Sequence, residues 1–485
     1  MSSPEPPYAR KVFELHHLSA VEQLDWLRRG EITPRELAEH YLARIARLDG
    51  ELGAFAVVDA DAALARADAA AALPHALALW GLPTADKALV ARAGRVSAFG
   101  SRAFAGHVPA ESDELALVLD AAGAVSLGAT AAPEFGFPSY TEPLAGRPAR
   151  NPYDLALGAG GSSGGAAVAV AAGLLPVAPG SDGGGSIRIP AAATGLVGLK
   201  PSRGRVPAAS GFETLAGLVT AGPLARTVAD AGLLLDALVA PPGAAASWAT
   251  APPGSDEGPF LAAATRGEGR FQLAVSTDSP WAGAYELALD PAARAALELA
   301  IAELTALGHG IEELRIPEEP GYSDAFRTVW QAGAATLPLD DALLELVEPL
   351  TRWLVERGRA LDARRLGEAL AWLAGYERRT IARLAPYDAV LMPALALTPR
   401  PVGWYDPDDG EENFAQQVRY TPFTSFVNVA GLPAITLPVH ATAEGLPMGV
   451  QLVGRPGGER TLLALGAQLE RRLRWQRRHP PAWTA

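Results

Sequence analysis

The sequence contains no cysteine among its 485 residues and only three lysines, although Lys and Arg together number 41. The missing thiols exclude disulfides, a cysteine nucleophile and a thiolate-ligated metal. Arginine supplies nearly all the positive charge, but a guanidinium does not release its proton. Lys11, Lys87 and Lys200 therefore stand out as candidates for a task that needs a neutral amine. Lys87 lies in LPTADKALV, where apolar neighbours favour the uncharged form.

An excess of basic residues is also missing, because 41 Lys and Arg against 54 Asp and Glu give a net charge of −13. This balance argues against a nucleic-acid partner. No apolar run approaches the roughly 20 residues that span a membrane, and the first twenty residues lack the pattern of a secretion signal. We expect a cytoplasmic protein with neither a membrane nor a nucleic-acid partner.

Helical segments followed by short apolar strands recur along the chain. Residues 19–30 have a capping box and a terminal glycine, and residues 33–50 have Thr33 as N-cap, Pro34 at the first position and Gly50 as the expected end. The pattern of a helix and then a strand follows at 112–128, 164–180 and 291–317. Such alternation predicts an α/β layered fold.

Two glycine-rich serine clusters, GGSSGG at 160–165 and GSDGGGS at 180–186, lie close together in the sequence. The first could be a loop that ends in a serine-capped helix. It also satisfies G-x-S-x-G around Ser163, the nucleophile elbow of α/β-hydrolases, which would require a downstream acid and histidine, either His309 or His440. A phosphate cradle is disfavoured because the G-x-x-x-x-G-K-[ST] pattern is absent.

The second cluster places Ser186 after three glycines and before a segment that we predict to be a short helix. Consecutive glycines allow backbone N–H groups to turn inward, where they can hold a developing oxyanion. A serine nucleophile needs a proton acceptor, and Lys87 is the candidate. The alternative is a glycine-rich turn with an incidental serine.

Together these residues resemble the amidase signature family, whose serine hydrolases use a Ser–cis-Ser–Lys triad. The similar stretches extend over nearly the whole chain and include GLPTADKALV, RNPYDLALGAGGSSGG, GSDGGGSIRIPAAATGLVGLKPSRGRVP and FVNVAGLPAITLPVHATAEGLPMGVQLVGRP. The resemblance implies a single α/β/α sandwich domain over residues 1–485 around a large mixed β-sheet. Within it we expect an N-terminal helical segment at about 10–72, a signature core at about 73–240 and a C-terminal portion at about 260–485.

The resemblance also implies the role of each site residue. Ser186 would be the nucleophile, Ser162 the bridging serine next to a cis peptide bond, and Lys87 the base that takes the proton through Ser162. The implied oxyanion hole consists of backbone N–H groups, and further residues would shape the loop or serve a structural role. The oxyanion donors would be Gly183, Gly184, Gly185 and Ser186, the loop-shaping residues Asp182, Arg188 and Ser163, and the structural residue Lys200.

Three features depart from the family pattern: Ala88 follows Lys87 where many members have aspartate, Gly183 stands where a larger residue is common, and AAATG at 191–195 lacks a cysteine often found there. The implied activity is hydrolysis of C–N bonds in small-molecule amides, with ester or carbamate side activity. No metal and no organic cofactor is implied, and we expect a monomer or homodimer. Alternatives are an amidotransferase subunit of the same family and a non-catalytic binding protein. We hypothesise that EFGFPSY, residues 134–140, and the loop of Trp404 and Tyr405 border an apolar pocket for the acyl or leaving group, with Tyr140, Trp404 and Tyr405 as its lining residues.

Overall fold

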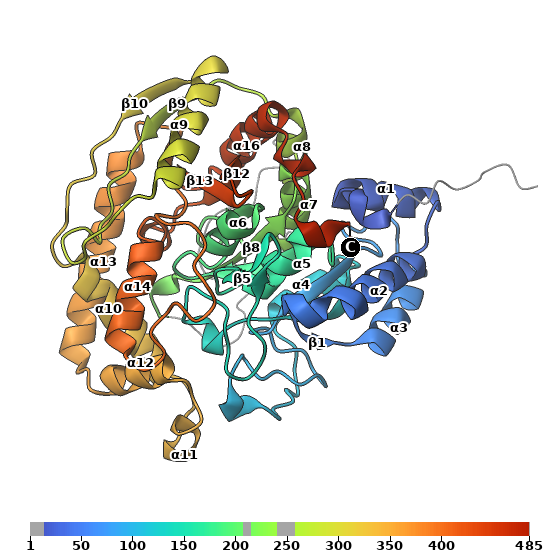
Figure 1. Cartoon of the computed structure of the whole chain (residues 1–485), viewed down its shortest axis with the longest axis horizontal. Helices are drawn as coiled ribbons and strands as arrows, with labels where there is room; N and C mark the ends of the chain where they lie inside the picture. The colour runs from blue at the N-terminus through green and yellow to red at the C-terminus, as the bar shows by residue number, and fades with distance from the viewer. Residues whose placement is uncertain (1–13, 207–214, 240–257, 485) are drawn as a thin grey trace, which may run out of the picture.

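The computed structural model describes residues 14–206, 215–239 and 258–484, and its largest element is an eight-stranded mixed sheet (Figure 1). The three strands at one edge are parallel, and every later neighbour pairs antiparallel. This mixed sheet confirms the predicted α/β class. The strand order is β10 (Gly310–Glu313), β9 (Gln272–Val275), β11 (Ala389–Pro393), β13 (Pro447–Gly454), β12 (Ala434–Ala441), β7 (Val197–Lys200), β8 (Thr220–Ala225) and β6 (Val177–Asp182).

Helices cover both faces of this sheet. Successive side chains of a strand point to opposite faces, and Thr436 and Leu437 of β12 show which helices lie where. Thr436 and Ala192 of α6 (Arg188–Thr194) both lie next to Gly449, so α6 is on the face to which Thr436 points. Leu437 packs on Gly466 of α16 (Glu459–Leu473), so α16 is on the opposite face. Helix α5 (Gly164–Ala171) packs against α6. The helices that pack with α16 are α7 (Val228–Leu238), α8 (Phe260–Arg266) and α9 (Pro291–Ala306).

A smaller sheet brings Lys87 to the edge of the large one. It consists of β1 (Phe55–Val58), β3 (Val125–Thr130) and β2 (Pro83–Lys87), with β2 parallel to β3. Strand β2 lies against β6, where Thr84 Oγ1 donates to the Val177 carbonyl at 3.4 Å. Because both strands run toward the same end, Lys87 at the end of β2 meets Ser181 near the end of β6.

Glycines at the start of α5 allow the helix to approach the smaller sheet closely. All residues of α5 are buried, and a Cβ on Gly165 would lie 2.3 Å from the Ala131 nitrogen and 2.5 Å from the Ala54 oxygen. Only a residue without a side chain fits there. The GGSSGG cluster is therefore a packed segment and not a flexible loop.

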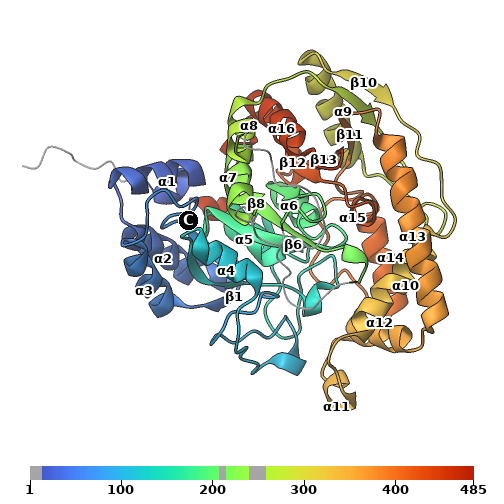
Figure 2. The same ribbon diagram turned by 180° about the vertical axis from the view of Figure 1, so that it is seen from behind.

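The N-terminal helices are α1 (Ala20–Arg29), α2 (Pro34–Leu52), α3 (Ala60–Ala70) and α4 (Glu114–Ala121) (Figure 2). Helices α2 and α3 pack on the smaller sheet, and α1 and α4 contact α7. The capping box and the end of α1 at Gly30 are confirmed. The predicted end of α2 at Gly50 is wrong, because the helix continues to the buried Leu52. Its C-cap is Gly53, with φ of 64°, where a Cβ would lie 2.3 Å from the Pro148 oxygen.

The helices of the C-terminal half gather at the opposite end of the molecule from α1–α3 (Figures 1 and 2). One of them, α10, contributes a wall of the site described below. They are α10 (Tyr322–Ala335), α11 (Asp341–Leu344), α12 (Pro349–Arg359), α13 (Ala363–Leu384), α14 (Gly410–Tyr420) and α15 (Ser425–Val429). Among the described residues, no helix is both long and apolar enough to cross a membrane.

Candidate active site

Lys87 is buried, with 2% of its surface exposed, and it contacts two serines. Its Nζ donates to Ser162 Oγ at 2.8 Å, to Ser181 Oγ at 3.0 Å and to the Ser181 carbonyl at 3.4 Å. Burial lowers the pKa of Lys87 from 10.5 to about 7, and the negative charge of Asp182 opposes this shift only in part. A neutral amine is therefore accessible near physiological pH.

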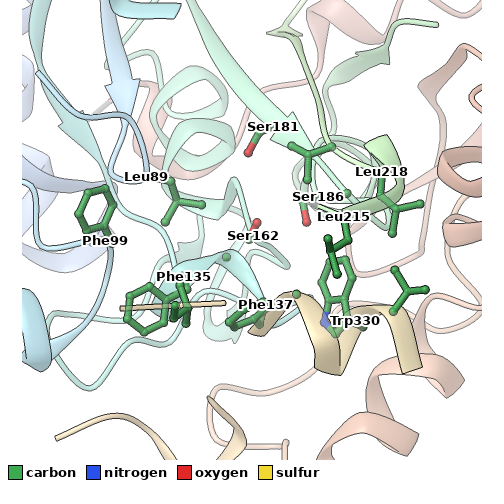
Figure 3. Close-up of a pocket in the computed structure, with 16 residues that line it drawn as sticks. Leu89, Phe99, Phe135, Phe137, Ser162, Ser181, Ser186, Leu215, Leu218 and Trp330 are labelled. Carbon is green, nitrogen blue, oxygen red and sulfur yellow. The ribbon is translucent and has the colours of Figure 1, made fainter. Parts of the chain in front are cut away.

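Ser162 lies on the segment that leads into α5, and the peptide bond between Gly161 and Ser162 is cis. A Cβ on Gly161 would lie 2.5 Å from the backbone of Tyr140, so a glycine is needed at this approach. Ser162 and Ser186 face the same cavity (Figure 3). The Ser163 N–H donates to the Ser186 carbonyl at 3.1 Å, which ties the two serine clusters together.

The loop that carries Ser186 is folded around the buried carboxylate of Asp182. This carboxylate accepts from the Gly185 N–H at 2.7 Å and the Ile187 N–H at 3.1 Å. It also accepts from Arg188 Nε at 3.0 Å and Nη2 at 2.9 Å. Burial by itself would raise the pKa of Asp182, but Arg188, Lys200 and Asn428 together outweigh burial and hold this pKa well below its usual range.

The arrangement corrects one of the predicted oxyanion donors. Because the Gly185 N–H is directed at Asp182, it is not available to a substrate, and the prediction for that group is wrong. The N–H groups of Gly183, Gly184 and Ser186 form no hydrogen bond to another described residue. Gly185 has a different task, since its φ is 133° and a Cβ there would lie 2.5 Å from Thr424 Oγ1.

Two cavities meet at Ser186. Ser186, Phe137 and Trp330 line both of them, and the two rings pack edge to face with centroids 5.9 Å apart. Ser162, Ser181 and Gly183 line the first cavity, whereas Gly184 lines the second. The remaining walls of the first cavity are Leu89, Phe99, Phe135, Gly136, Leu215, Leu218, Val219, Val329, Gly333 and Leu337, many of them visible in Figure 3. Those of the second are Pro138, Ser139, Ile189, Trp281, Phe326, Phe414, Gln417, Val418, Thr421 and Ser425.

The hypothesis that Tyr140, Trp404 and Tyr405 border the pocket is wrong, because none of them lines either cavity. The Tyr140 ring stacks on that of Tyr405 with centroids 4.0 Å apart, and Tyr405 is buried. Asn413 Nδ2 donates to Tyr140 Oη at 2.9 Å, which holds the ring in place. The aromatic wall comes instead from Phe135 and Phe137, a few residues earlier in the same segment.

The nucleophile-elbow hypothesis is also wrong. Ser163 is completely buried, and its Oγ donates to the Ser181 carbonyl and accepts from the Ser181 N–H, both at 3.3 Å. His309 accepts from the Phe271 N–H at 3.1 Å, and its other ring nitrogen contacts Gln468. His440 lies in β12 opposite Met448. Neither histidine lines the cavities at Ser186.

Ser181 is a site residue that sequence reasoning missed, although it stands in the quoted GSDGGGS motif. Asn428 was missed too: its Nδ2 donates to the Asp182 carbonyl at 2.7 Å, and nothing in its sequence context indicated this contact. Lys200 is buried behind the site, where its Nζ donates to the Pro201 carbonyl at 2.7 Å. Burial lowers the pKa of Lys200 to about 7. Lys11 lies outside the described residues.

The geometry is accompanied by clear similarity to known proteins. The profile of the amidase family matches residues 36–463. The "Putative amidase AmiB2" of Mycobacterium tuberculosis is 39% identical over 483 residues, which cover 96% of this chain and 98% of that protein. A solved structure of 6-aminohexanoate cyclic dimer hydrolase has 30% identity and a TM-score of 0.86, covering 96% of this chain and 99% of the other. The peptide amidase from Stenotrophomonas maltophilia has 26% identity and a TM-score of 0.79, with coverage of 99% and 100%.

A buried lysine beside two serine clusters on an α/β/α scaffold is thus found in a chain with whole-length similarity to amide hydrolases. The protein belongs to the amidase family, in the branch that carries the amidase signature. It is a hydrolase that acts on the C–N bonds of amides.

Proposed function

We propose that the protein hydrolyses neutral small-molecule amides through an acyl-enzyme on Ser186. The observation that carries this proposal is the 2.8 Å hydrogen bond between Lys87 Nζ and Ser162 Oγ, beside the cavity that Ser186 lines. In this mechanism Ser162 accepts the proton of Ser186 while passing its own proton to neutral Lys87. Ser186 Oγ then attacks the amide carbonyl carbon.

The hydrogen bonds of Lys87 suit both protonation states of its amine. An ammonium has three N–H donors, and three acceptor atoms lie within reach on Ser162 and Ser181. A neutral amine keeps two donors for Ser181 and turns its lone pair toward the Ser162 hydroxyl. The proton can therefore move from Ser162 to Lys87 without any side chain having to reorient.

The tetrahedral intermediate would be held by the backbone N–H groups of Gly183, Gly184 and Ser186. These donors are fixed before substrate arrives, because the Asp182 carboxylate accepts from the Gly185 N–H in the same loop and Thr424 Oγ1 donates to the Gly184 carbonyl at 2.6 Å. Donors held in place in a water-poor site stabilise developing charge strongly. Gly183 departs from the family pattern, and the space beside it is filled by Val219 and Trp330.

We infer that the amine part of the substrate occupies the first cavity and the acyl part the second. The leaving nitrogen must receive a proton from Ser162, and Ser162 lines only the first cavity. The acyl carbon, on the other side of the carbonyl, then extends toward the second. No charged side chain among the described residues lines either cavity, which favours neutral, largely apolar groups at both ends.

The first test is hydrolysis of an aryl amide, an aliphatic amide, an aryl ester and an aryl carbamate by the wild type and by Ser186→Ala. We expect the variant to lose activity on all four, and Ser163→Ala to retain a soluble folded protein with activity. Ser162→Ala should impair amides more than the aryl ester, because an amine leaving group needs protonation and a phenol does not. Amide hydrolysis by Ser186→Ala would refute the assignment of the nucleophile.

The cavity assignment is tested with a matched pair of variants. A Cβ on Gly333 would meet no atom within 4 Å, so the side chain of Gly333→Leu starts in open space and narrows the first cavity. Val418→Phe narrows the second. Gly333→Leu should lower kcat/KM for bulky amines and Val418→Phe for bulky acyl groups. The opposite pairing would reverse the assignment while leaving the Ser186 mechanism intact.

A further inference from the structure

Two histidines and a glutamate converge at the junction of the chain's two ends, away from the cavities at Ser186. His16 lies in η1 (Leu15–His17), His40 in α2, and Glu14 directly precedes η1. One ligand atom from each residue lies within 4.8 Å of the other two. The C-terminus lies beside α1 and α2 in both views (Figures 1 and 2), and Trp483 of η7 (Pro481–Trp483) contacts His16.

The hydrogen bonds of His16 fix which of its ring nitrogens carries the proton. Its Nε2 lies 3.1 Å from the Trp483 carbonyl oxygen, which can only accept, so Nε2 must donate. A neutral imidazole then has a bare lone pair on Nδ1.

His40 presents a second lone pair at the same point. Its Nε2 accepts from the backbone N–H of His16 at 3.2 Å and lies 3.2 Å from His16 Nδ1. If His40 instead carried its proton on Nε2, that proton would face the His16 N–H. Without a proton on Nε2, its lone pair faces the lone pair of His16 Nδ1; with a proton there, two N–H groups face each other.

A metal cation between His16 Nδ1 and His40 Nε2 would bind both lone pairs, and at His40 it would replace the hydrogen bond from the His16 backbone N–H. Two nitrogens bound at about 2.0–2.1 Å to a tetrahedral zinc ion lie about 3.3 Å apart, close to the 3.2 Å between these two. The carboxylate of Glu14 is 3.5 Å from His16 Nδ1 and can supply a third ligand with a negative charge. The bond from His16 Nε2 to a carbonyl is the outer contact that metal-binding histidines usually make.

We propose that Glu14, His16 and His40 form a binding site for a divalent transition-metal ion, with Zn²⁺ as the best match to two imidazoles and one carboxylate. Because Glu14 is exposed, the fourth position is open to water. The ion would hold η1 to α2 and, through the bond from His16 to the Trp483 carbonyl, to the C-terminal segment. None of the three residues lines the cavities at Ser186, so the role is structural and not catalytic.

The charge of Arg44 opposes a cation here, but this residue lies on the other side of the His16 ring. Its guanidinium donates to the carbonyls of Ala172, Gly173 and Trp483, and the last is the carbonyl that also accepts from His16 Nε2. The lone pair of Nδ1 points away from that carbonyl. Arg47 adds a further positive charge near His40, and the negative charge of Glu14 acts against it there.

The test titrates Co²⁺ and then Zn²⁺ into the chelator-treated full-length protein. One Co²⁺ per chain should give the visible absorption of a tetrahedral site, Zn²⁺ should displace it, and Zn²⁺ should raise the Tm. His40→Gln should weaken binding at least tenfold, the order expected when a ligand is lost. Glu14→Gln, an exposed change that does not threaten folding, should weaken it as well.

His107→Gln is the matched control, because His107 is exposed and lies outside the cluster. It should leave affinity, spectrum and Tm shift unchanged. Catalytic activity of the metal-free enzyme at low temperature should also stay within about twofold of the loaded enzyme. The proposal is overturned if the wild type binds Co²⁺ no more tightly than Glu14→Gln and His40→Gln do, or if His107→Gln removes the same binding.

Discussion

The protonation state of Lys87 provides the sharpest prediction, because the base must be neutral and burial lowers its pKa to about 7. The rate constant kcat/KM for a neutral amide should rise through this pKa as the pH increases and then level off. The substrate has no group that titrates in this range, so the rising limb reports the free enzyme.

The magnitude follows from the pKa. With a value of about 7, roughly 9% of Lys87 is neutral at pH 6 and roughly 91% at pH 8, so kcat/KM should increase about tenfold between them. If Lys87 kept the ordinary lysine pKa of 10.5, kcat/KM would still increase tenfold per pH unit at pH 9. The position of the limb thus measures how strongly burial acts on this amine.

The assay is the initial rate of hydrolysis of a neutral anilide from pH 5.5 to 9.5 at constant ionic strength. Lys200 needs a control, because burial gives it a similar pKa of about 7. Lys200→Met keeps the shape of the buried chain and should preserve the limb near pH 7. Lys87→Met should abolish activity across the whole range.

Two results would refute this reasoning. A flat profile across pH 6–8 would mean that no group with a pKa near 7 controls the reaction. If Lys200→Met removed the rise of kcat/KM near pH 7, with kcat/KM at pH 6 already at its maximum, the titrating group would be Lys200 and not Lys87.

Three further predictions concern the same buried groups. Lys87→Met should have a higher free energy of unfolding than the wild type. This difference should be largest below pH 7 and shrink by at most about 5 kcal/mol toward pH 10.5, because between these pH values Lys87 of the wild type is protonated in the unfolded chain and neutral in the folded one. Urea unfolding at pH 6 and 9.5 checks this, and a pH-independent difference contradicts it. Ser181→Ala should move the kcat/KM limb to lower pH, since the ammonium loses an acceptor; an unmoved limb would exclude that contact. Arg188→Met should cost about 3–5 kcal/mol in urea unfolding, because it leaves Asp182 buried without its partner, and a loss below about 1 kcal/mol would argue against a paired carboxylate.

Local sequence signals predicted the helix ends well where capping chemistry decides them. The capping box of Ser19 and Glu22 and the αL glycine at Gly30 bound α1 as expected. The end of α2 was misplaced because Gly50 is as good a local stop signal as Gly53. The close contact of Gly53 with Pro148, far away in the sequence, belongs to tertiary packing.

The motif around Ser186 predicted which residues gather at the site, but not how each backbone group is used. Gly185 belongs to the same glycine run as its neighbours, yet the carboxylate of Asp182 takes its N–H. The aromatic segment from Phe135 to Tyr140 was correctly suspected as a pocket wall, but the residues that fill this role were misassigned. Stacking on Tyr405 turned Tyr140 away, and that partner comes from a distant segment.

The sequence by itself determined the residue types that the chemistry requires: two serine clusters with the glycines that their tight backbone needs, and one of only three lysines in an apolar strand. Only the tertiary structure decided that β2 lies against β6, which joins Lys87 to Ser181 across 94 residues. The pKa of Lys87 was decided there as well. Desolvation depends on everything that packs around an amine, and those neighbours come from segments that the chain's local pattern does not connect.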